Sequence, residues 1–136
     1  HLLGEGAHVL NGDTWLEYAP VALEAAARVV DAPMAIALAR VDDVARYGAV
    51  DVADSRVAAF REKGEAGPGW INAGCYFLGA DALAALPRGA FSFEHAVLQP
   101  RTAAGEVAAF NATAGFIDIG VPEDYARAQT LFAGHV

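Results

Sequence analysis

Blocks of apolar residues alternate with polar turn residues along the chain, and their spacing predicts which blocks are strands and which are helices. Short apolar runs that end in glycine, asparagine or proline are typical of buried strands. Longer Ala-rich stretches with apolar residues three or four positions apart are typical of helices. The predicted strands cover residues 8–11, 33–41, 48–52, 56–63, 70–78 and 106–110, with a strand or tight turn at 116–120. The predicted helices cover most of 14–30, regular from near Pro20, and then 81–86, 92–98 and 122–132.

The order of these elements predicts an α/β fold with a mixed sheet. Strands that alternate with helices are typical of layered α/β domains. Residues 48–52 and 56–63, however, flank the polar turn Ala53-Asp54-Ser55 and predict an antiparallel hairpin within the sheet. No repeat, low-complexity tract or linker divides the sequence, so residues 1–136 are predicted to form a single domain.

Composition and charge narrow the function. Hydrophobic residues make up 55% of the chain and charged residues 19%, which excludes disorder. The longest apolar stretch, 19–30, contains Glu24 and Arg28, so no membrane span is predicted, and no signal peptide is recognised. The net charge is −8 without a cluster of basic residues, which excludes a nucleic-acid surface. The single cysteine, Cys75, is predicted to be a small buried side chain. Because it has no partner for an internal disulfide, a reducing cytoplasm is the expected location.

Two aspartates are candidate metal ligands because each lies where a predicted strand ends. Asp13 follows the run at 8–11, and Asp118 lies within 116–120, and both are close to glycines. Ligands of open α/β sheets bind beyond the carboxyl ends of strands, and Mg²⁺ bound to phosphate takes one or two carboxylates. The alternative is that each aspartate caps a turn or helix, and for either residue alone that alternative is favoured. The histidines lack metal-ligand spacing, so zinc is not expected.

A second group of candidate residues surrounds the only lysine. The other eight basic residues are arginines, so a site that needs a compact ammonium is expected at Lys63, next to Glu62. The alternative is a solvated strand end, which this pair alone favours. Gly48 and Gly74, the latter two residues after Asn72, lie in or beside strands. Such glycines mark either a close approach of a ligand to the backbone or a bulge.

Six motifs occur in the order found in sugar-phosphate nucleotidyltransferases, and through them the chain resembles that family over nearly its whole length. Each motif alone is weakly specific, but six in the right order are a strong signal. Three of them look closest to the D-glycero-α-D-manno-heptose 1-phosphate guanylyltransferase branch: Phe-Arg-Glu-Lys, Phe-Ser-Phe-Glu, and Ile-Asp-Ile-Gly with Pro-Glu-Asp-Tyr. The six motifs are Val9-Leu10-Asn11-Gly12-Asp13, Arg46-Tyr47-Gly48, Phe60-Arg61-Glu62-Lys63, Ile71-Asn72-Ala73-Gly74 with Tyr76, Phe91-Ser92-Phe93-Glu94, and Phe116-Ile117-Asp118-Ile119-Gly120 with Pro122-Glu123-Asp124-Tyr125.

The resemblance implies a fold, a reaction and a metal. The fold would be a Rossmann-like three-layer α/β/α nucleotidyltransferase fold, of which this chain is the C-terminal, sugar-phosphate-binding part. The reaction would transfer a nucleoside monophosphate, GMP from GTP in the closest branch, to a sugar 1-phosphate of the heptose or mannose type and release pyrophosphate. Asp13 and Asp118 would be catalytic by binding the Mg²⁺ that bridges the nucleotide α-phosphate and the sugar phosphate.

The resemblance also implies how the sugar phosphate is held. Lys63 would contact its phosphate as a further catalytic group, and Glu62 would bind its hydroxyls. Gly48 would offer its backbone to the sugar, while Asn72, with Gly74, would shape and polarise the pocket. The partners would be a nucleoside triphosphate and a sugar 1-phosphate, and a homo-oligomer is left open.

Two departures from the family pattern limit what the resemblance implies. The family's glycine-rich Gly-Gly-x-Gly-Thr-Arg loop does not occur in this sequence, so the piece is expected to lack most of the nucleotide site and to be inactive alone. Val121 stands where the family often has threonine, a better N-cap. A uridylyl- or thymidylyltransferase of the same fold and a non-catalytic sugar-nucleotide-binding subunit are the alternatives.

Overall fold

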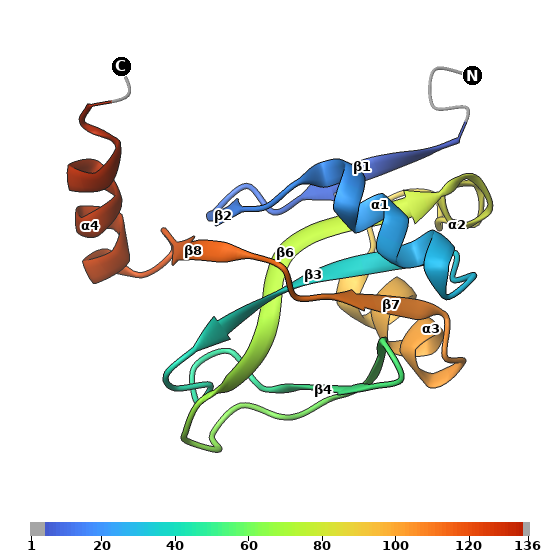
Figure 1. Ribbon diagram of the computed structural model, residues 1–136, viewed down its shortest axis with the longest axis horizontal. Helices are drawn as coiled ribbons and strands as arrows, with labels where there is room; N and C mark the ends of the chain where they lie inside the picture. Colours follow the sequence, from blue (N-terminus) through green and yellow to red (C-terminus); the bar gives the residue numbers. More distant parts are fainter. Residues whose placement is uncertain (1–4, 135–136) are drawn as a thin grey trace.

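The computed structural model describes residues 5–134 and arranges them as one sheet covered by helices on both faces, with a smaller two-stranded ribbon beside it (Figure 1). None of the described helices is long and apolar enough to cross a membrane. The strands are β1 (Gly6–Leu10), β2 (Thr14–Glu17), β3 (Met34–Val41), β4 (Val50–Ala53), β5 (Arg56–Phe60), β6 (Gly69–Gly79), β7 (Val107–Phe110) and β8 (Ala114–Asp118). The helices are α1 (Pro20–Val29), α2 (Ala80–Ala84), the π-helical turn η1 (Glu94–Leu98), α3 (Gln99–Ala103) and α4 (Pro122–Phe132).

The main sheet is mixed, as the sequence predicts. Its six strands lie in the order β1-β6-β3-β7-β5-β4, and only the β3–β7 pair is parallel. The predicted hairpin is formed by β4 and β5. Its turn residues Asp54 and Ser55 have φ angles of 51° and 61°. Two successive left-handed residues are the turn geometry that matches the twist of a tight hairpin.

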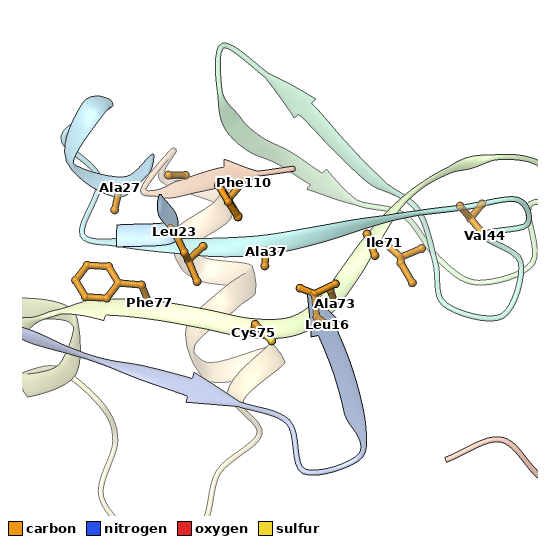
Figure 2. Close-up of a cluster of buried hydrophobic side chains, with 13 residues drawn as sticks. Leu16, Leu23, Ala27, Ala37, Val44, Ile71, Ala73, Cys75, Phe77 and Phe110 are labelled. Carbon is orange, nitrogen blue, oxygen red and sulfur yellow. The ribbon is translucent and has the colours of Figure 1, made fainter. Parts of the chain in front are cut away.

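The central strand β3 shows why helices cover both faces of the sheet. Successive side chains of a strand point to opposite faces, and β3 alternates alanines with larger residues along its length. The alanine face packs under Leu23 and Ala27 of α1 (Figure 2). On the other face, Met34, Ile36 and Leu38 pack with residues of α2 and η1. The predicted three-layer α/β/α architecture is therefore confirmed.

Two elements differ from the sequence prediction. Residues 14–17 form strand β2 and not the start of a helix, because they pair with β8, which lies far away in the sequence. Regular helix begins at Pro20, as expected. The helix predicted at 92–98 continues to Ala103 through α3. It widens into a π-turn just before Pro100, because proline has no N–H with which to continue the α-helical ladder.

Arg56 connects the hairpin to the end of α1, and its loss should weaken the fold measurably. Its Nη2 atom donates to the carbonyl oxygen of Val30, the C-cap of α1, at 2.6 Å. We expect Arg56→Met to lower the free energy of unfolding by about 1.5 kcal/mol, because a half-buried carbonyl loses a charged donor. Urea unfolding measures the change. Arg88→Met, at an exposed arginine, is the matched control, and equal midpoints for the two variants would contradict the prediction.

Candidate active site

The β2–β8 ribbon brings Asp13 and Asp118 together from opposite ends of the sequence. Thr14, the first residue of β2, pairs with Asp118, the last residue of β8. The backbone N–H of Ile119 also donates to the carbonyl oxygen of Asp13 at 2.8 Å. Each aspartate therefore lies at the same end of the ribbon, Asp13 exposed and Asp118 half-buried.

Gly120 leaves open the space that the two carboxylates share. A Cβ atom on Gly120 would lie 3.0 Å from Oδ1 of Asp118 and 3.6 Å from Oδ2 of Asp13. Oδ1 of Asp118 accepts the Gly120 N–H at 2.9 Å, so the turn-capping alternative applies to this oxygen. This hydrogen bond uses only Oδ1 of Asp118 and does not involve Oδ2. Two carboxylates around one small gap match the all-oxygen ligands of Mg²⁺, which takes its remaining ligands from phosphate and water.

Gly48 and Lys63 also lie together. The N–H of Arg61 donates to the carbonyl of Ala49 at 2.8 Å, and the N–H of Gly64 donates to that of Ala45 at 3.0 Å. Gly48 has a φ of +81°, and a Cβ there would lie 2.7 Å from the Arg61 carbonyl oxygen and 3.8 Å from Cγ of Lys63. A side chain at position 48 would therefore collide with the backbone just beyond β5, in the segment that carries the lysine.

Glu62 and Lys63 are both exposed on this segment. The described contacts join neither side chain to Asp13 or Asp118. The structure thus brings four candidate positions together as two pairs, Asp13 with Asp118 and Gly48 with Lys63. Glu62 is exposed beside the second pair.

Tyr47 lies near Asp118 and next to Gly48, and it had no role assigned from the sequence. Its ring packs edge-on against Phe116 of β8 with centroids 5.7 Å apart. Burial raises the pKa of Tyr47, and the negative charges of Asp118 and Asp124 add to the rise while Arg46 opposes it. The signal in the sequence was the Arg-Tyr-Gly motif, of which only the glycine was singled out. An open cavity of about 390 Å³ lies here, lined by Arg40, Val41, Asp42, Asp43, Arg46, Tyr47, Phe116, Asp124 and Arg127.

Asn72 and Gly74 form a bulge in β6. Gly74 has a φ of +77°, and its N–H donates to Oδ1 of Asn72 at 2.9 Å. The carbonyl of Gly74 accepts the N–H of Asn11 at 2.8 Å, which fixes the end of β1 to the bulge. A Cβ on Gly74 would lie 2.7 Å from Nδ2 of Asn11 and from Oγ1 of Thr14. The structure confirms the bulge, and the groups that lie against Gly74 are the chain's own Asn11 and Thr14.

Cys75 is a buried free thiol, as expected. It hydrogen-bonds with Tyr18, and burial raises the pKa of the thiol. A neutral buried thiol is a poor nucleophile. Among residues 5–134 no group of three or more His, Cys, Asp or Glu side chains could hold a metal ion by itself.

The three-layer fold is the fold of sugar-phosphate nucleotidyltransferases of known structure. A putative glucose-1-phosphate thymidylyltransferase from Bacillus anthracis superposes with a TM-score of 0.71 at 17% identity, over 94% of this chain and 55% of that one. The identity is low, so this match shows the fold alone. No protein-family model matches the chain.

Within that class, the chain is a relative of the D-glycero-α-D-manno-heptose 1-phosphate guanylyltransferases. It is 38% identical to the enzyme of that name from Aneurinibacillus thermoaerophilus over 103 residues, which cover 72% of this chain and 43% of the relative. It is 36% identical to the Campylobacter jejuni protein of the same name over 121 residues, or 88% of this chain and 52% of the relative. The family resemblance predicted from the motifs is thus confirmed.

A solved structure supports the same relationship. HddC from Yersinia pseudotuberculosis, also solved in complex with GMP-PN, has a TM-score of 0.77 and 38% identity, over 93% of this chain and 55% of that one. The chain spans about half the length of the curated relatives it matches.

Proposed function

We propose that the whole protein containing this chain is a Mg²⁺-dependent guanylyltransferase that transfers GMP from GTP to a heptose- or mannose-type sugar 1-phosphate. The observation that carries the proposal is the meeting of Asp13 and Asp118 around the gap left by Gly120. The relatives named as heptose 1-phosphate guanylyltransferases support the choice of base and sugar. A cytoplasmic location fits the single, unpaired cysteine.

In the proposed reaction an oxygen of the sugar phosphate attacks the α-phosphorus of GTP. The bond from that phosphorus to the oxygen bridging to the β-phosphate breaks, and pyrophosphate leaves. The attacking oxygen is already ionised, so positioning and charge neutralisation matter more than a general base. This agrees with a site that has carboxylates and a lysine, while the only cysteine is buried in the core.

In this proposal, one group of residues binds the metal and another binds the sugar phosphate. Asp13 and Asp118 would hold the divalent cation, which when bound neutralises charge on the reacting phosphates. The ammonium of Lys63 would bind the sugar phosphate, and Glu62, exposed beside it, would accept hydrogen bonds from sugar hydroxyls. The backbone of Gly48, packed against the segment that carries Lys63, would contact the sugar at this edge.

One amide would face the same pocket from β6. Asn72 has one of its two Nδ2 hydrogens engaged by Tyr76 and its Oδ1 engaged by Gly74, so one N–H is left for a ligand.

Pyrophosphate release by the whole protein tests the proposal. We expect release only when GTP, a heptose- or mannose-type 1-phosphate and Mg²⁺ are all present, with each omission as a control. Faster release from UTP or dTTP would favour a uridylyl- or thymidylyltransferase of the same fold. Binding of a sugar nucleotide without turnover of any triphosphate would favour a non-catalytic subunit and contradict the proposal.

A further inference from the structure

Tyr76 joins two parts of the candidate site that are far apart in the sequence. Its phenol oxygen accepts a hydrogen bond from Nδ2 of Asn72 at 2.9 Å, and it also hydrogen-bonds with the side chain of Asn11. Asn72 belongs to the proposed sugar pocket, whereas Asn11 precedes the candidate metal ligand Asp13 by two residues. A single hydroxyl group therefore touches both the sugar side and the metal side.

The contact between Asn72 and Tyr76 exists only because β6 is bulged between them. In a regular strand, residues four apart are separated by roughly 13 Å. Here Ile36 of β3 lies opposite Tyr76 and Leu38 lies opposite Asn72, so two steps along β3 match four steps along β6. The extra length is taken up around Gly74, whose left-handed backbone turns the Asn72 amide back toward the phenol.

The bulge also fixes the chain that leads to Asp13. The N–H of Asn11 donates to the Gly74 carbonyl at 2.8 Å, and the Asn11 side chain reaches the Tyr76 oxygen. Asn11 is thus held at its backbone and at its side chain, and only one residue separates it from Asp13. A shift of the phenol would be passed through the Asn11 side chain to the backbone that leads to Asp13.

The phenol is itself held firmly and stays neutral. Tyr76 is 3% exposed, and its ring packs edge-on against Phe93 with centroids 4.9 Å apart. Phe93 comes from the Phe-Ser-Phe-Glu motif, which the candidate site otherwise leaves without a use. Burial raises the pKa of Tyr76, so the hydroxyl does not ionise near neutral pH.

We propose that Tyr76 is a positioning residue of the transfer reaction, whose hydroxyl fixes Asn72 and Asn11 and thereby places the sugar pocket relative to Asp13. The inference rests on the proposed function of the same site. Partners that orient metal ligands and pocket residues typically contribute about 10- to 100-fold to metal affinity or activity.

Tyr76→Phe in the whole protein tests this inference, because it removes only the hydroxyl. We expect kcat/KM to fall about tenfold. The Mg²⁺ concentration for half-maximal rate and the KM for sugar phosphate should rise together. Tyr18→Phe is the matched control, since it removes the hydroxyl of a half-buried tyrosine that hydrogen-bonds with Cys75. A Tyr76→Phe enzyme with the Mg²⁺ dependence and both kinetic constants of the wild type would overturn the inference.

A readout without activity separates this inference from the proposed function. In the ¹⁵N-labelled 136-residue chain, the side-chain amide signals of Asn11 and Asn72 should shift and exchange faster with water in Tyr76→Phe but not in Tyr18→Phe. Unchanged signals would overturn the positioning role even if the enzyme is active. An inactive wild-type protein with shifted signals would instead show that the proposed function is wrong and the local role correct.

Phe93→Leu covers the case in which Tyr76→Phe does not fold. It keeps the phenol and its hydrogen bonds and loosens only the ring packing. We expect the half-maximal Mg²⁺ concentration to rise in this variant too, by less than in Tyr76→Phe. An unchanged value in folded Phe93→Leu would count against the inference.

Discussion

Replacement of both Asp13 and Asp118 by asparagine is expected to lower kcat of the whole protein about a thousandfold or more. Asp13 and Asp118 carry the carboxylates nearest to the gap at Gly120. Neutral amides would bind a divalent cation weakly, and the charge stabilisation that a metal supplies to a reacting phosphate is worth several kcal/mol. The rate is measured as pyrophosphate release from GTP at saturating substrate and Mg²⁺.

The double variant should remain folded, so that the loss reports on the site. An asparagine at position 118 keeps the oxygen that accepts the Gly120 N–H, and position 13 is exposed. Asp31→Asn with Asp54→Asn is the matched control. It removes the same two charges at exposed residues whose φ angles of 53° and 51° suit asparagine. A rate within a few-fold of the control would show that Asp13 and Asp118 do not hold the metal.

The layered fold could be predicted from the sequence because local patterns determine most of its elements. The alternation in 33–41, the hairpin turn at Asp54 and Ser55, and Pro20 at the start of α1 each act within a few residues. Strand β2 could not be predicted in this way. Its four residues are a strand only because β8, about a hundred positions later, offers them a partner, and an Ala-rich stretch follows directly and suggests a helix.

In the candidate site, too, the residues marked by local sequence patterns could be predicted and those brought together by long-range contacts could not. Asp13 and Asp118 could be singled out because each follows an apolar strand and stands near a glycine, and the resemblance supplied the reason to pair them. Their roles, and those of Lys63 and Asn72, remain predictions. Tyr76 could not be found from spacing. In a regular strand, a tyrosine four residues after an asparagine lies roughly 13 Å further along the same face, out of hydrogen-bonding reach.

The bulge at Gly74 removes that separation. It depends on the left-handed backbone of Gly74, whose φ is +77°. In the sequence, such a glycine signals either a bulge or a ligand, without showing which residues the bulge brings together. Tyr47 was missed for a related reason. Its meeting with Phe116 depends on β8 crossing beside the end of β3, which is a long-range arrangement.

Gly120→Ala is expected to weaken binding of a divalent cation about a hundredfold while leaving the fold intact. The new methyl carbon would lie 3.0 Å from Asp118 Oδ1 and 3.6 Å from Asp13 Oδ2, where it would exclude the ion or its bound water. Mg²⁺ requires near-ideal octahedral geometry and keeps several waters, so it tolerates such crowding poorly. The upper end of the effects known for a disturbed ligand environment is therefore expected.

The backbone itself should accept the alanine. Gly120 does not have a left-handed φ, so the substitution adds no backbone strain. Alanine also has fewer conformations than glycine in the unfolded chain, which favours the folded state. Gly12→Ala is the matched control, since it is also a glycine beside a candidate ligand, has an ordinary φ, and has open space where the methyl group would go. Titration of Mn²⁺ into each variant measures affinity, and urea unfolding measures stability. Equal affinities in Gly120→Ala and Gly12→Ala would mean that the gap between the two carboxylates is not where the cation binds. A loss of affinity confined to Gly120→Ala, at unchanged stability, would support binding of the cation between Asp13 and Asp118.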